Sequence, residues 1–170
     1  MASNDGNMFF EEKQFFRQWW LWVILIGING IFWLGFIQQL ARWQSADTGF
    51  GAIAGMFVLV FAFGLFTFLF FIFGLETRID IDGIHIRFIP FNTDFKHYTW
   101  DKISRYHIRK YHPLREYGGW GIRGGVDGMA YNVSGDRGLQ LEMKDGKKIL
   151  IGTGKPDEME AALARLEKSA

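Results

Sequence analysis

The pattern of apolar and polar positions divides the chain into two unlike halves. In the first half, no ionisable side chain lies between Arg17 and Arg42 or between Asp47 and Glu76. A bilayer core of about 30 Å is crossed by roughly 20 helical residues, so each of these stretches is long enough to span a membrane. The pattern therefore predicts a transmembrane helical hairpin, joined by a short polar turn.

The segment before the first span alternates aromatic pairs with charges. It reads MFFEEKQFFR from Met8 to Arg17. Its phenylalanines are compatible with an interfacial helix in the headgroup region, and equally with the first solvated turns of the spanning helix. Both interpretations predict helix here.

Several side chains inside the spans indicate how they are held. Tryptophans at positions 19, 20, 22 and 43 flank the first span and mark its two water boundaries. Asn29 lies mid-span, and a buried amide in lipid is expected to bond the other helix or another subunit. Gly51 and Gly55 have the four-residue spacing that allows close approach, either within the hairpin or between subunits.

Basic residues predict the orientation. Lys13 and Arg17 precede the first span, Arg78 and Arg87 follow the second, and the turn contains only Arg42. The positive-inside rule then places both termini in the cytoplasm. We therefore expect a multi-pass protein of the plasma (inner) membrane.

From Thr77 onward the apolar period changes from helical to two, which is typical of strands. Two Asp-Gly pairs, at Asp82 and Asp145, stand where hairpin turns need them. Pro156 begins an amphipathic helix that is expected to run to about Lys168. This layout predicts a small β-barrel or sandwich of about seven antiparallel strands with a C-terminal capping helix.

Four motifs in order support a family resemblance. The segments YGGWGIR (117–123), AYNVSG (130–135), GLQL (138–141) and DGKKILIGT (145–153) resemble those of bacterial pleckstrin-homology-like (PH-like) domains. The chain is similar to two-span bacterial membrane proteins that end in such a domain. The resemblance implies a seven-stranded PH-like barrel with no established catalytic residues. The predicted fold is thus an α+β membrane protein, with domains over 1–17 (polar or interfacial), 18–75 (hairpin, helices about 18–40 and 49–75) and 76–170 (cytoplasmic PH-like domain).

One strand carries three of the five candidate contact residues. Arg105, His107 and Arg109 alternate with Tyr106 and Ile108, which predicts a cationic outer stripe on a half-buried strand. This stripe could meet anionic lipid headgroups or a protein partner, or it could be an ordinary solvated strand face. Trp120 and Arg123, in the glycine-rich segment that follows, complete the set of candidate residues.

The amino-acid composition excludes several classes of chemistry. The chain has no cysteine, which excludes disulfides and thiolate catalysis, and its net charge of +1 is too small to indicate nucleic-acid binding. The histidines show no metal-ligand spacing, and no nucleophile lies beside a base. We therefore predict no enzyme activity, no cofactor and no metal.

The predicted function is a non-enzymatic binding or scaffold module held at the cytoplasmic face of the inner membrane. Its expected partners are the lipid bilayer, a protein partner, or a second copy bound through the hairpin. The alternative is an accessory subunit of a membrane transport complex, or a small membrane-associated enzyme.

Overall fold

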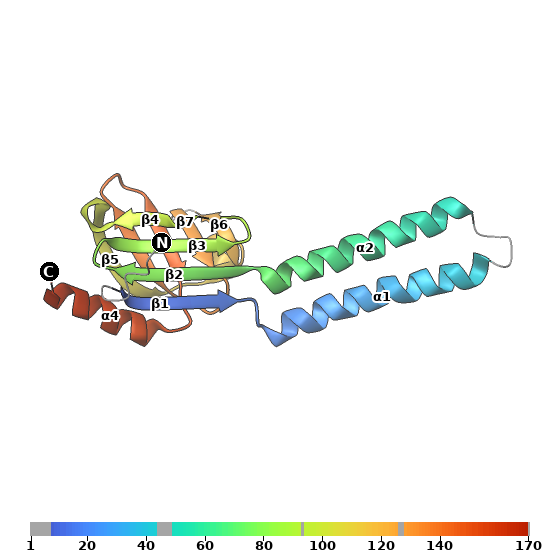
Figure 1. Cartoon of the computed structure of the whole chain (residues 1–170), viewed down its shortest axis with the longest axis horizontal. Coiled ribbons are helices and arrows are strands. Elements are labelled where there is room, and N and C mark those ends of the chain that lie inside the picture. Colours follow the sequence, from blue (N-terminus) through green and yellow to red (C-terminus); the bar gives the residue numbers. More distant parts are fainter. Residues whose placement is uncertain (1–7, 44–48, 93, 126–127, 170) are drawn as a thin grey trace. The chain divides into compact units, whose positions relative to one another are not determined.

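The structure, a computed structural model, describes residues 8–43, 49–92, 94–125 and 128–169. It divides into two compact units, one formed by residues 17–72 and the other by residues 1–16 and 73–170. Figure 1 labels most of the elements and colours the chain in sequence order. The elements are β1 (Met8–Phe15), α1 (Trp19–Trp43), α2 (Phe50–Ile72), β2 (Gly74–Asp80), β3 (Gly83–Ile89), β4 (Lys96–Thr99), the 3-10 turn η2 (Trp100–Lys102), β5 (Ile103–Lys110), α3 (Pro113–Tyr117), β6 (Gly121–Gly125), β7 (Gly128–Asn132), β8 (Arg137–Met143), β9 (Lys148–Gly152) and α4 (Pro156–Ser169).

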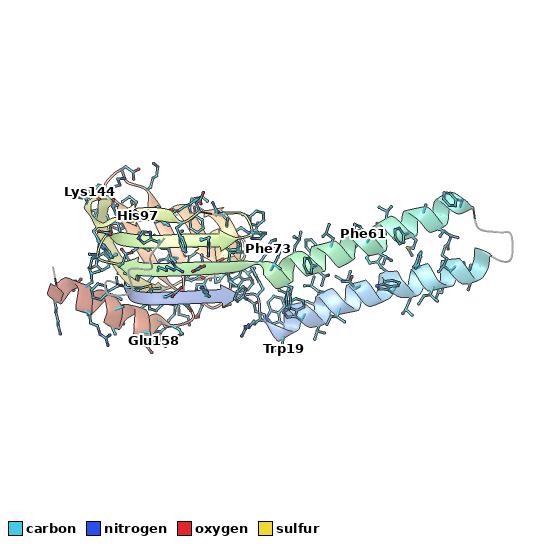
Figure 2. All side chains as sticks on the ribbon, in the orientation of Figure 1. Trp19, Phe61, Phe73, His97, Lys144 and Glu158 are labelled. Atoms are coloured by element: carbon cyan, nitrogen blue, oxygen red, sulfur yellow. The ribbon has the colours of Figure 1, made fainter. Side chains whose placement is uncertain are left out.

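The first of these units consists of the two predicted apolar helices, α1 and α2. Each is long and apolar enough to cross a membrane. Most of their large side chains are exposed, including Phe61 of α2, which is labelled in Figure 2. A helix that is apolar all round and exposed is compatible with a lipid environment.

Asn29 bonds the neighbouring helix, which confirms one of its two expected roles. Its amide nitrogen donates to the Thr67 hydroxyl at 2.6 Å and to the Leu25 carbonyl at 2.7 Å. The Thr67 hydroxyl in turn donates to the Phe63 carbonyl at 2.9 Å. One polar contact therefore fixes the register of α1 against α2.

We expect this contact to add a measurable coupling energy within the hairpin. In a double-mutant cycle, Asn29→Leu and Thr67→Val should be coupled by about 0.6 kcal/mol, and by no more than about 1.7 kcal/mol. The measurement is the loss of helical circular dichroism of the full chain during titration of mild detergent with SDS. Additive effects of the two changes would contradict the contact.

The glycines at the four-residue spacing do not pack α1 against α2. A β-carbon added at Gly51 or Gly55 would meet no described atom within 4 Å, whereas one at Gly35 would collide with Met56. Packing within the hairpin therefore does not explain the Gly51 and Gly55 pair. Their role between subunits stays a prediction.

The N-terminal segment forms a strand, β1, and the prediction of a helix there is wrong. β1 runs antiparallel to β2, with Glu11 opposite Arg78 and Phe15 opposite Gly74. Its alternate side chains are buried from Phe10 to Phe16. The two-helix unit is thus an insertion between two neighbouring strands of one sheet.

Buried polar groups on β1 are matched by the loop between β9 and α4. The Thr153 hydroxyl donates to the Glu12 carboxylate at 2.6 Å, and the Gly154 N–H donates to the same carboxylate at 3.0 Å. The Gln14 amide donates to the Gly152 carbonyl at 2.8 Å. These bonds offset the cost of burying the polar side chains, so β1 ties the first sheet to the start of α4.

The strands form two sheets, which corrects the predicted closed barrel of about seven strands. One sheet has the order β1-β2-β3-β4 and the other β5-β8-β9-β7-β6, nine strands in total among the described residues. Figure 1 shows the first sheet in one layer with strands of the second behind it. β7 and β9 pair in parallel, so the second sheet is mixed. Motif order alone could not predict the additional strands.

The C-terminal helix matches its prediction. α4 begins at Pro156, and Met159, Leu163 and Leu166 are buried on one face. The turn at Asp145 is also confirmed, since Gly146 follows at φ +84°, a conformation that glycine adopts readily. The core of this unit lies between the sheets and α4. Its fully buried members include Ile79, Ile84, Leu139, Leu141, Leu150 and Ile151.

Candidate functional site

A large hollow in the β-rich unit lies where β5 begins. Its volume is about 890 Å³, within the range of ligand sites. It is formed by the β2–β3 turn, η2, the first half of β5 and the end of α4, and we call it the β5–α4 groove. Its lining residues are Ile81, Trp100, Ile103, Ser104, Arg105, Tyr106, Leu166 and Glu167.

β5 contributes a free backbone edge to this groove. In the described sheet β5 is an outer strand that pairs only with β8. An irregularity between Ile103 and Arg105 interrupts that pairing, and both Ser104 and Arg105 are exposed. The local bend therefore presents polar side chains and unpaired strand edge at the mouth of the groove.

Polar contacts hold the apolar walls in place. The Tyr106 hydroxyl donates to the Glu167 carboxylate at 2.7 Å, which joins β5 to α4. Burial and this hydrogen bond raise the pKa of Tyr106 to about 12, so the phenol stays protonated at neutral pH. The Trp100 indole N–H donates to the Asp80 carbonyl at 3.0 Å, and its ring lies 5.4 Å from that of Tyr106. These rings form a preorganised apolar surface.

Arg105 is the candidate residue that the structure places in the groove. Within the described residues its guanidinium makes no hydrogen bond or ion pair to another side chain, and it is exposed. Its charge is therefore available to an incoming acidic group. A carboxylate or phosphate at this position would gain a charge-assisted hydrogen bond.

Arg109 lies on the same strand but is already engaged. Its guanidinium forms an ion pair with Glu116 at 2.8 Å and donates to Gln140 at 3.0 Å and to the Tyr117 hydroxyl at 3.3 Å. Burial acts to lower the pKa of Arg109, but the Glu116 carboxylate and Tyr117 outweigh it and raise the pKa. Arg109 thus fixes α3 against the second sheet.

The remaining candidate residues lie farther along β5 and at β6. His107 is half-buried on β5, and its Nδ1 atom has no described hydrogen-bond partner. Trp120 and Arg123 lie at β6, the opposite edge of the five-stranded sheet. There the Arg123 side chain donates to the Trp120 carbonyl at 3.1 Å. The five predicted residues therefore divide between the two edges of this sheet, three on β5 and two at β6.

Histidines and carboxylates come together at one other place. His85 and His97 stack at 4.0 Å between ring centroids, and His85 Nε2 lies 2.9 Å from an oxygen of Asp80. Among the described residues, no group of three or more metal-ligating side chains has a geometry that could hold a metal ion. The stack is a cross-strand pair of β3 and β4.

Sequence reasoning missed most of the groove. Nothing in the sequence pairs Trp100 with Ile81 or with Leu166 and Glu167. Those residues meet only because α4 packs back across the sheets. Arg105 was found through strand alternation.

Comparison with known proteins found no match. The chain matches no protein family, no curated protein and no solved structure.

Proposed function

We propose that this protein is a membrane-anchored, PH-like binding module that captures an extended segment of a cytoplasmic protein in its β5–α4 groove. The observation that carries the proposal is the coincidence of three features at one place. A free strand edge, an apolar groove and the unpaired cation Arg105 lie side by side. Strand addition uses such an edge for affinity and an adjoining pocket for specificity.

Other strand edges of this unit suit a partner less well. β4 is short and carries Lys96 and exposed His97, and charge on an edge opposes pairing. β1 is contacted by α4. β6 is rich in glycine, which weakens strand pairing. β5 combines an open edge with the groove of about 890 Å³, whereas the hollow beside Tyr98 of β4 is smaller, about 490 Å³.

The position of the groove along β2 favours a protein segment as its ligand over a bilayer lipid. The groove includes Ile81, which follows the end of β2 opposite the one joined to α2. Six residue steps from Gly74 to Asp80 correspond to about 20 Å of strand. A ligand in the groove therefore need not be part of the bilayer.

Anchoring at the cytoplasmic face is supported by the hairpin and its flanks. Since β1 and β2 are neighbours in one sheet, the chain leaves and re-enters the β-rich unit at the same end. Two spans between these strands return the chain to the side on which it started. The basic residues near both junctions favour the cytoplasm.

Peptide selection tests the groove. Random peptides would be selected for binding to the full chain in lipid nanodiscs. The affinity of the selected peptides would then be measured for the unaltered chain and for the groove variants Ile81→Ser and Arg105→Glu. We expect at least tenfold weaker binding for each, because about 1.4 kcal/mol per contact gives that factor. Backbone N-methylation at alternate peptide residues should also abolish binding, since it removes the ladder donors.

Matched controls come from α3. Leu114→Ser and Arg115→Glu change an exposed apolar side chain and an exposed cation outside the groove. These variants should bind selected peptides like the unaltered chain. If the selected peptides bound the unaltered chain, both groove variants and both control variants with equal affinity, the groove would not be the binding site.

A further inference from the structure

Phenylalanine side chains cluster at the end of the first sheet where the chain departs for α1 and returns from α2. The rings of Phe16 and Phe73 lie 6.4 Å apart, edge to face. Phe91, in the turn between β3 and β4, lies 5.2 Å from Phe73 and 6.2 Å from Phe88. We call these four residues the phenylalanine cluster.

The cluster has a buried side and an exposed side. Phe16 and Phe88 belong to the core, whereas Phe91 is 66% exposed. Phe73, labelled in Figure 2 beside the start of β2, lies between them. The exposed ring therefore extends the core outward at this end of the sheet.

Chain connectivity places this end next to the spans. Phe73 directly follows Ile72, the last residue of α2, and Phe16 comes shortly before α1. The 23 residues of α2 measure about 34 Å, slightly more than a hydrocarbon core of about 30 Å. If α2 spans the bilayer, Phe73 must lie in the headgroup layer, whichever way the β-rich unit is turned.

Basic side chains lie on β1, β2 and β3, farther along these strands than the phenylalanine cluster. Lys13, Arg78 and Arg87 surround the Glu76 carboxylate, which is only 1% exposed. Burial acts to raise the pKa of Glu76, but the hydrogen bond and charge of Arg87, with the charges of Arg78 and Lys13, lower it. With Glu11 included, three cations face two carboxylates. This group of charged side chains therefore has a net positive charge.

An apolar tip with cations behind it has the order of layers found at a membrane surface. Aromatic rings favour the boundary between acyl chains and headgroups, and cations favour the phosphates just outside it. Lys13 and Arg87 are two residues from Phe15 and Ile89, or about 7 Å along their strands. This separation matches the depth of the interfacial layer.

We propose that the turn carrying Phe91 is a third point of membrane contact, with its ring inserted at the boundary between acyl chains and headgroups. The partner is the lipid bilayer itself. The inference rests on the proposed anchoring by α1 and α2, and it adds a contact made by the β-rich unit. This contact would restrict how that unit turns above the membrane.

Single-cysteine spin labelling tests the insertion. The chain has no cysteine, so Phe91→Cys gives one labelled site in the full-length protein. In nanodiscs of phosphatidylethanolamine and phosphatidylglycerol, collisions of the label with oxygen and with a water-soluble nickel chelate are measured. Oxygen is enriched in lipid and the chelate is excluded, so the label at position 91 should show a several-fold higher oxygen-to-nickel ratio than a label in water.

Two further sites calibrate the measurement. Leu114 has the same exposed fraction as Phe91, 66%, so Leu114→Cys is the matched control for water. Val58, on α2 and 62% exposed, gives the value within a span through Val58→Cys. Asn92→Cys provides a second reading in the turn if Phe91→Cys does not fold.

The outcomes separate this inference from the proposed anchoring. A lipid-like ratio at position 58 with a water-like ratio at 91 and 92 would overturn the inference and leave the anchoring intact. A water-like ratio at position 58 would overturn the anchoring itself. Shielding of position 91 from both reagents would indicate a protein contact and also overturn the inference.

Discussion

Replacing residues 17–72 with a Gly-Ser linker of about four residues should yield a folded β domain that needs no membrane. The linker joins Phe16 to Phe73, whose neighbours Phe15 and Gly74 are opposite each other in the sheet. Residues in such a pair have α-carbons about 5 Å apart, so a short turn closes the gap. A fragment that begins at Phe73 should instead fail to fold.

Loss of β1 explains the expected failure. Without it, β2 loses one of its two ladders and the unit loses the buried rings of Phe10 and Phe16, each worth about 2 kcal/mol. The Thr153 hydroxyl and Gly154 N–H also lose the Glu12 carboxylate. These losses together are comparable to the whole stability of a typical domain, about 5–15 kcal/mol.

Amide NMR spectra distinguish the two proteins. The linked domain should give dispersed resonances, and the fragment from Phe73 should give collapsed ones until a synthetic peptide of residues 8–16 is added. Dispersed resonances from the fragment alone would show that β1 is dispensable.

The second large effect is expected at Glu12. Glu12→Ala leaves the buried Thr153 hydroxyl and the part-buried Gly154 N–H without their acceptor, and hydrogen bonds to a charged group contribute about 1.5–3 kcal/mol each. We expect a loss of about 3 kcal/mol, which should lower the melting temperature by more than about 10 °C. Near-ultraviolet circular dichroism of the full chain in detergent during heating measures this change.

Glu11→Ala is the matched control for this prediction. Glu11 is the preceding residue on the same strand, but it faces outward and pairs with Arg78 at the surface. Such exposed pairs contribute less than about 1 kcal/mol, so this variant should melt within a few degrees of the unaltered chain. Similar losses from the two changes would contradict the buried role of Glu12.

The sequence allowed α1, α2 and α4 to be predicted, but not the short α3, because the signals of these three helices are local. An uncharged apolar run is sufficient for α1 and α2, and Pro156 with a periodic apolar stripe is sufficient for α4. The signal of β1 was hidden because its buried face includes Glu12 and Gln14. These polar residues are accommodated by the end of β9 and the residue that follows it, which are 138 or more residues away in the chain.

The site was only partly predictable for a related reason. Strand alternation identified Arg105, but it gave Arg109 the same role. Only the arrangement of α3 shows that Glu116 and Tyr117 engage Arg109. The groove itself combines residues from Ile81 to Glu167, and no local pattern reports such distant neighbours.

The pairing of β1 with β2 also constrains how the protein is made. β1 leaves the ribosome first and must wait for its partner while residues 16–73 are synthesised, several seconds at about 5–20 residues per second. If α1 and α2 span the bilayer as proposed, both must enter it during that interval, since an odd number of crossings would leave the two strands on opposite sides. Completion of this sheet would therefore act as a built-in check that membrane insertion has proceeded correctly.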